Sequence, residues 1–323
     1  MLNTTVMQQE NTSAQDGVLA DTSAQQQIEM VVGQVAELPV LGFPALVKHT
    51  RAAALIDLLR IKLGYPREVF DRAVSPVIAG YAEFVQLLPA LAAQHHSHHG
   101  GLYVRALEVA SRALDYRRGQ ILPRGAAPEV IGAQAHRWTY AVFLAALLYD
   151  VGHTLAGLRV LIRGEQGALE QWAPLAGSMF ACGASYYRVE LPGNATTQRA
   201  LYAGLPMSLL NQVVPPSVLD WLAADPGLMR ELTAFLSEDP SARAGAISGL
   251  VLRAAIELGR CELKPDGSDD SAVEVTAPAT TPVDVDSENV ADDLAATTVA
   301  ADVPGLLYPE TEYLEDVEEH SSG

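Results

Sequence analysis

Histidines are concentrated in one short segment of the 323-residue chain. Four of the eight fall within five residues, just before a Gly-Gly pair: His95, His96, His98 and His99. Imidazole is a common ligand of transition metals and an acid or base near neutral pH, so this segment is a candidate metal or acid–base site. Gly100 and Gly101 let the backbone pass close to another element or a ligand. An exposed polar turn would have the same composition, and the residues alone leave both interpretations open.

A second candidate lies at the end of the apolar run 140–148, where Asp150 and His153 follow in the segment Asp-Val-Gly-His. A carboxylate and an imidazole this close can share a metal ion or move a proton, so both are candidate catalytic residues. Asp150 also fits the role of an ordinary turn residue at a helix end.

The elements that must position these residues are helical. Apolar periodicity indicates an all-α domain with at most one short strand pair. Helices are expected over 44–63, 68–91 (kinked or broken at Ser75-Pro76), 101–116, 128–149, 153–163, 167–184, 198–210, 216–224, 227–236 and 241–258, and a short strand or an extended link over 186–191.

Both ends of the chain have a different composition, which divides it into a tail over 1–37, a helical domain over 38–264 and an acidic tail over 265–323. Low hydrophobicity and charge of one sign predict that both tails are disordered. The net charge is −18, but residues 1–39 hold five acids and 265–323 hold sixteen, with no base in either. The remaining core has 18 acids and 21 bases, which is compatible with phosphate binding and equally with an ordinary solvated surface.

The expected compartment is the bacterial cytoplasm. No secretory signal is recognisable, and the run 140–148 is about half the length of a membrane span, so no membrane contact is expected. Cys182 and Cys261 stand outside any metal-ligand spacing and suit a reducing compartment.

The order of the motifs resembles a known family. The segments are Phe-Val-Gln-Leu-Leu-Pro-Ala (84–90), Gly-Gly-Leu (100–102), Leu-Glu-Val-Ala (107–110) and Ala-Leu-Leu-Tyr-Asp-Val-Gly (146–152). Together they resemble the TraI domain of MobH-class conjugative relaxases, over roughly residues 38–260. The resemblance implies an HD-like helical core and a role at the transfer origin of conjugative plasmids and integrative conjugative elements.

The departures from this family concern its metal site. HD-type sites bind divalent metals through a His on the first motif helix, a His-Asp pair and a later Asp. This chain has Arg105 and Tyr149 where the resemblance implies histidines, and only Asp150 is kept. His153 replaces a lysine that is usual in the family, and Ser97 interrupts the family's triple-His run. An arginine has no lone pair to offer a metal at neutral pH.

Two outcomes follow from these departures. In one, His95, His96, His98, His99 and Asp150 form a rewired site for Mn, Fe, Ni or Zn. In the other, which we expect, the domain keeps the fold and has lost the metal chemistry. Arg105 is then expected to be buried and to pair with Asp150, replacing the charge of the metal, whereas a surface arginine with no partner is the ordinary alternative.

Three functions remain as hypotheses. The first is a conjugation protein that binds transfer-origin DNA or other conjugation proteins, with its metal site degenerate. The second is an active metal-dependent relaxase, nuclease or phosphohydrolase. The third is a non-catalytic scaffold protein. The loop arginines Arg117, Arg118 and Arg124 could contact phosphate, although arginines in a loop are more often simply solvated.

Overall fold

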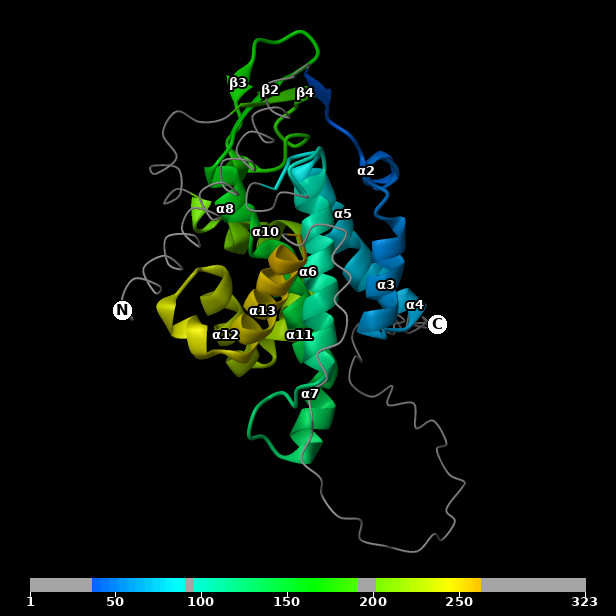
Figure 1. The fold of residues 1–323 in the computed structure, drawn as a ribbon, viewed down its shortest axis with the longest axis vertical. Coiled ribbons are helices and arrows are strands. Elements are labelled where there is room, and N and C mark those ends of the chain that lie inside the picture. Colours follow the sequence, from blue (N-terminus) through cyan, green and yellow to red (C-terminus); the bar gives the residue numbers. More distant parts are fainter. Residues whose placement is uncertain (1–36, 91–95, 191–201, 263–323) are drawn as a thin grey trace, which may run out of the picture.

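Helix α7 (Pro128–Leu148) lies at the centre of the fold in the computed structural model, which describes residues 37–90, 96–190 and 202–262 (Figure 1). Every residue from Tyr140 to Leu148 is buried, so this part of the helix has no polar face and needs neighbours on all sides. Helix α6 (Gly101–Arg118) packs along it, and both run parallel to the long axis of the molecule.

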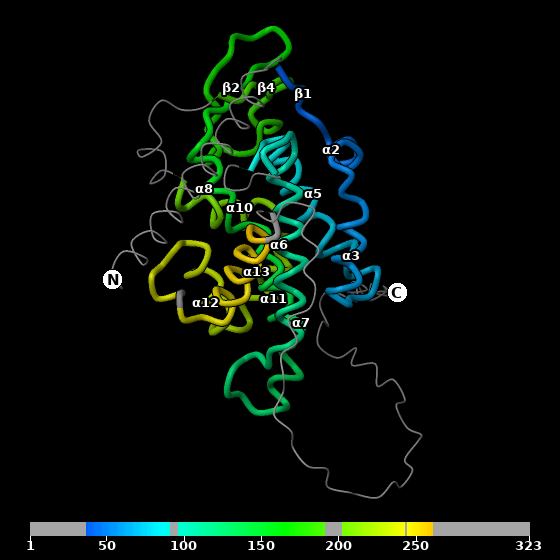
Figure 2. The backbone as a smooth tube through the Cα atoms, viewed as in Figure 1, coloured from blue at the N-terminus to red at the C-terminus, as the bar shows by residue number. Residues whose placement is uncertain are grey.

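The N-terminal helices cover one side of this central pair. α2 (Phe43–Thr50) and α3 (Ala53–Leu63) are separate helices, so the prediction of one helix over 44–63 is wrong. Arg51 ends α2 in the left-handed conformation with φ 57°, which redirects the chain (Figure 2). α4 (Arg67–Val69), a π-helical turn (Phe70–Val74) and α5 (Ser75–Val85) follow. The turn ends at Val74, just before Ser75-Pro76, and the chain stays helical from Arg67 to Val85, so the helix is not broken there. Pro76, which has no N–H to donate, lies in the first turn of α5, where a proline is tolerated.

Gln86 fastens the start of the domain to the end of α5. It is buried and has φ 50°, a conformation that costs energy for a residue with a side chain. Its side-chain amide donates to the Leu41 carbonyl at 3.0 Å and to the Glu83 carbonyl at 2.7 Å, and its oxygen accepts from the Leu41 N–H at 2.8 Å. These bonds satisfy backbone groups of residue 41 that no strand or helix pairs.

A small antiparallel sheet covers one end of the helices (Figure 1). Its strand order is β1-β4-β2-β3, from β1 (Leu38–Pro39), β2 (Arg159–Arg163), β3 (Glu170–Gln171) and β4 (Tyr186–Glu190). Val160 pairs with Val189, and Leu38 pairs with Tyr187. The strand predicted over 186–191 is confirmed for residues 186–190, while the sheet has more strands than the single pair expected.

Two predicted helices are wrong. The segment expected to form a helix over 153–163 divides into α8 (Val151–Ala156) and strand β2, because the β-branched Val160 and Ile162 fit the sheet. The segment 167–184 contains β3 and a 3-10 turn (Pro174–Ala176). Gly177 has φ 131°, which no helix allows, and its carbonyl accepts a bond from the buried indole of Trp172.

The C-terminal helices close the opposite side of α7. They are α10 (Leu205–Val213), α11 (Pro216–Ala223), α12 (Pro226–Leu236) and α13 (Ala246–Glu262), with a 3-10 turn (Pro240–Ala244) before the last. α12 and α13 pack on α7, and α13 also packs on α6. The predicted mainly helical fold is thus confirmed. Apart from Glu37, the disordered tails predicted for 1–37 and 265–323 lie outside the described residues.

One stretch of the described residues, Pro128–Ala156, is long and apolar enough to span a membrane. Of its most apolar window, 78% is buried against the rest of the domain, as is typical of a core helix.

Candidate functional site

The Gly-Gly pair has a structural role in the loop before α6. Gly100 has φ 82°, in the left-handed region that favours glycine, and its N–H donates to the Leu87 carbonyl at 3.0 Å. A Cβ atom added to Gly101 would lie 1.7 Å from the His96 carbonyl oxygen. The loop therefore folds back on itself and attaches to the Leu-Leu-Pro-Ala segment after α5, where the Ala90 N–H donates to the same His96 oxygen at 2.9 Å.

The histidines before this pair do not converge. His96 is buried, with its Nε2 3.2 Å from Oε2 of Glu108 on α6. His98 and His99 are exposed, and the rings of His96 and His98 are 6.3 Å apart. Partial burial, together with the nearby His49 and His98, lowers the pKa of His99. His95 lies outside the described residues.

Arg105 and Asp150 meet inside the helical core, as the sequence predicted. Nε of Arg105 on α6 lies 3.3 Å from Oδ2 of Asp150, which stands between α7 and α8. The two residues are 6% and 8% exposed. Removing two charges from water is costly, and the cost is offset when they pair closely. The ordinary alternative of a solvent-exposed Arg105 is therefore wrong.

Three tyrosines surround this ion pair. Tyr81 and Tyr103 are fully buried, and their hydroxyls have no hydrogen-bond partner among the described residues. Burial raises the pKa of Tyr81, and the charge of Asp150 and the nearby Tyr149 raise it further. Burial also raises the pKa of Tyr103. Both side chains therefore stay protonated phenols, which are poor metal ligands because a metal binds the phenolate.

The side chains at the expected ligand positions do not fit a divalent metal. Arg105 brings a positive charge to the one carboxylate that is kept, Asp150. His96 pairs with Glu108, and His153 pairs with Glu238 at 3.2 Å. Within 37–90, 96–190 and 202–262, no three His, Cys, Asp or Glu side chains come together as a metal-binding group. The rewired site, as far as it uses described residues, is not assembled.

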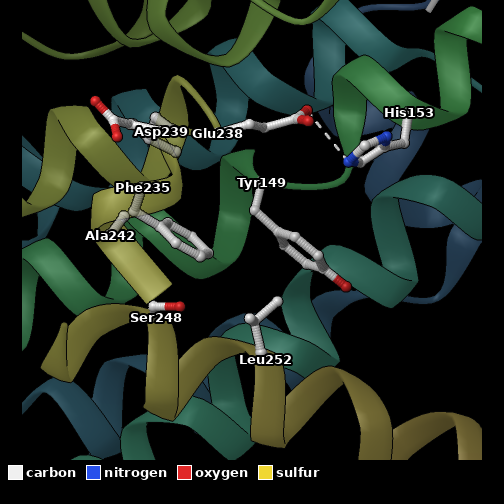
Figure 3. A pocket seen from close by; sticks show the side chains of 9 residues that line it. Tyr149, His153, Phe235, Glu238, Asp239, Ala242, Ser248 and Leu252 are labelled. Atoms are coloured by element: carbon white, nitrogen blue, oxygen red, sulfur yellow. Dashed lines mark ion pairs between the residues drawn. The ribbon is translucent and has the colours of Figure 1, made fainter. Parts of the chain in front are cut away.

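Tyr149 takes part in a pocket instead. The pocket has a volume of about 200 Å³ and lies where the end of α7 and α8 face α12 and α13. Figure 3 shows the rings of Tyr149 and Phe235 turned toward each other across it, with the His153–Glu238 pair on one side and Ser248 and Leu252 on the other. The ring centroids of Tyr149 and Phe235 are 6.4 Å apart and the planes are inclined by 30°.

The sequence indicated part of this pocket and missed the rest. His153 was a candidate catalytic residue, and it lies in the pocket rather than beside the carboxylate of Asp150 with which it was grouped. Phe235, Glu238 and Ser248 had no signal, because an aromatic residue and a serine on amphipathic helices resemble ordinary core and surface positions. The acidic Ser-Glu-Asp-Pro turn at 237–240 has the composition of a simple helix end.

Comparison with known protein families finds one family whose model matches most of the chain. The model of the family TraI_2, described as "Putative helicase", matches residues 40–266, more than half of the chain. No curated protein matches the chain. The phosphate-binding loop of motor proteins that hydrolyse nucleotides contains a Gly-Lys pair. The given sequence has three lysines, Lys48, Lys62 and Lys264, and none of them follows a glycine. The ion pair, the pocket and the Gly-Gly loop all lie within the matched region.

Proposed function

Because this chain belongs to the TraI_2 family, we propose that it serves conjugative transfer of a bacterial mobile element by binding transfer-origin DNA, without metal-dependent catalysis. It would act in the cytoplasm, beside the other conjugation proteins. The helical core in this proposal descends from an HD-type domain whose metal site has been replaced by an ion pair.

The buried contact between Arg105 and Asp150 carries the proposal. A metal-activated water needs a cation held by several neutral or anionic donors, so that its charge can lower the pKa of the water. Here a guanidinium supplies the positive charge at 3.3 Å from the carboxylate. A guanidinium compensates the carboxylate and holds no water in an acidic state, so the pair supports a structural role at this position.

The charge distribution supports DNA as the partner. Residues 40–127 hold eleven bases and six acids, whereas residues 128–264 hold ten bases and twelve acids. The connection between α6 and α7 lies at the end of the molecule opposite the sheet (Figure 1). Arg118, the last residue of α6, is exposed next to it, and Arg124 is exposed within it, whereas Arg117, which was expected in this loop, is buried within α6. An exposed basic end of this kind suits sequence-independent contacts with phosphate.

The metal content of the protein tests the loss of catalysis. The chain is purified without an affinity tag or chelator, alongside Asp150→Ala, and Mn, Fe, Ni and Zn are measured by plasma mass spectrometry. We expect no metal near one equivalent in either protein. A metal near one equivalent that disappears in Asp150→Ala would support the active-relaxase hypothesis, and cleavage of supercoiled transfer-origin DNA would then be the next assay.

DNA binding is tested by fluorescence anisotropy with a labelled transfer-origin duplex at several salt concentrations. Each phosphate that a variant no longer neutralises should reduce the slope of log K against log salt by about 0.9. The Arg118→Ala/Arg124→Ala variant should therefore bind more weakly, with a slope lower by about 2. Arg253→Ala is the control, because Arg253 is exposed on α13 and pairs with Glu257. Wild-type affinity in the double variant would remove this end of the molecule as the DNA-binding surface.

A further inference from the structure

The pocket between α7, α8, α12 and α13 has the chemistry of a site for a planar cation. Tyr149 and Phe235 supply two ring faces, while Glu238 and Asp239 supply carboxylates. Among the described side chains of the lining, His153 is the one basic residue, and none is a lysine or arginine. We propose that this pocket binds the guanidinium of an arginine side chain presented by a partner protein, an inference that does not depend on DNA binding.

The spacing of the two rings is the first argument. Carbon atoms in contact lie about 3.5–4 Å apart, so a planar group held between two parallel rings needs roughly 7 Å between them. The centroids of Tyr149 and Phe235 are 6.4 Å apart with an inclination of 30°. A small rotation of the Phe235 side chain would therefore admit a planar group. Guanidinium is planar and stacks favourably on aromatic faces.

Charge selects a cation among the planar groups. Hydrogen bonds from the backbone and side chain of Ser241 lower the pKa of Asp239, so this carboxylate stays charged, although it turns away from the two rings (Figure 3). Glu238 is 44% exposed in its side chain and faces the pocket mouth, where it pairs with His153 (Figure 3). A nucleobase would bring its phosphate toward these two carboxylates, which repel it. A guanidinium can instead donate two parallel hydrogen bonds to one carboxylate.

The backbone conformation of Glu238 supports the proposal independently of the ring spacing and the charges. Glu238 follows the end of α12 with φ 56°, its N–H donates to the Phe235 carbonyl, and the Asp239 N–H donates to the Ala234 carbonyl. This is the helix-ending arrangement in which glycine is the usual residue, because a Cβ atom is unfavourable there. A glutamate at this position makes the domain less stable than a glycine would, and it places a carboxylate at the rim of the pocket. Backbone strain retained in this way is typical of functional residues.

The test uses the full chain and three small probes followed by NMR: N-acetyl-arginine methylamide, the same derivative of citrulline, and 2′-deoxycytidine. Citrulline has nearly the shape of arginine and no charge. We expect the arginine probe to bind with a Kd on the order of 1 mM, as is usual for one side chain, and the citrulline probe at least tenfold more weakly. Equal binding of arginine and citrulline, or preferential binding of deoxycytidine, would overturn the proposal.

Three variants locate the binding. Glu238→Gln and Phe235→Leu should each weaken the arginine probe at least tenfold, while Glu257→Gln, a charge change on α13 outside the pocket lining, should leave it unchanged. Glu238→Gly separates binding from folding. It should lose the probe and yet keep or raise the thermal midpoint, because glycine relieves the backbone. Wild-type affinity in Glu238→Gly or in Phe235→Leu would show that the pocket is not the site.

Discussion

Breaking the Arg105–Asp150 pair from one side should be more damaging than removing it altogether. At 3.3 Å and an effective dielectric constant near 20, the attraction between the two charges is about 5 kcal/mol. Both side chains are nearly inaccessible to water, at 7% and 12% exposure. Asp150→Asn leaves the guanidinium buried without its counter-charge, and Arg105→Met does the same to the carboxylate. Each should lower the free energy of unfolding by about 3–5 kcal/mol.

The double variant Arg105→Met/Asp150→Asn should recover much of this loss, because no buried charge then remains. The coupling between the two substitutions is expected at about 2–4 kcal/mol, less than the full attraction because the polar tyrosines remain nearby. Urea unfolding followed by far-UV circular dichroism at pH 7 gives the four free energies of the cycle. The exposed pair of Arg60 and Asp57 is the control, since its side chains are 43% and 63% exposed and should couple by about 1 kcal/mol or less.

A coupling below about 1 kcal/mol would refute the reasoning, because a pair that compensates two buried charges cannot be worth as little as a surface pair. Single variants that fail to fold do not prevent the test. The double variant should still fold, and Asp150→Asn can then be measured in added sulfate, which strengthens burial for every variant alike.

Two further predictions concern the loop before α6 and the buried tyrosines. Gly101→Ala should lower the free energy of unfolding by about 2–4 kcal/mol, because its methyl group would collide with the His96 carbonyl. Gly132→Ala, on an open face of α7, should instead raise the free energy of unfolding by about 0.5–1 kcal/mol. Urea unfolding compares the two variants, and equal effects would contradict the packing of the loop. Burial raises the pKa of five tyrosines, Tyr65, Tyr81, Tyr103, Tyr140 and Tyr187, so the unfolded chain releases these protons at lower pH than the folded chain does. Stability that is present below pH 10 should therefore be lost as the pH rises above 10, by up to about 1.4 kcal/mol per pH unit for each tyrosine. The phenolate absorbance of these five near 295 nm should therefore appear together with unfolding, after that of the other six tyrosines, and phenolate from more than six tyrosines in a folded chain would show that the buried ones are accessible.

The sequence predicted best those elements whose own residues determine them. α7 is recognisable because its apolar run is too long for a strand and begins at Pro128, a usual first residue of a helix. The π-helical turn just before Pro76 fits the chemistry of proline, but the helix is not broken there. The sheet was largely missed because two of its strands, β1 and β3, have two residues each and exist only through their partners. No local pattern distinguishes such short strands from loops.

The candidate site, like the fold, could be predicted from the sequence only in part. The pairing of Arg105 with Asp150 could be predicted, because a lone cation and a lone carboxylate stood at positions that the family resemblance places together. The pocket could not, since it brings Tyr149 against Phe235, which is 86 residues later and on another helix. The histidine cluster misled by its composition, because its only buried described imidazole, that of His96, turns toward Glu108.

The pairing of Leu38 with Tyr187 also affects the order in which the domain can form during synthesis. These residues are 149 positions apart in the chain, from 187 minus 38. At about 5–20 residues per second, the ribosome needs roughly 7–30 s to deliver the second after the first. Throughout that time the segment after α5 is made, but Tyr187, whose hydroxyl accepts from the Leu87 N–H at 3.1 Å, is not. The nascent chain is thus exposed to aggregation for many seconds, and its yield in the cell should depend on chaperones that shield the first hundred residues.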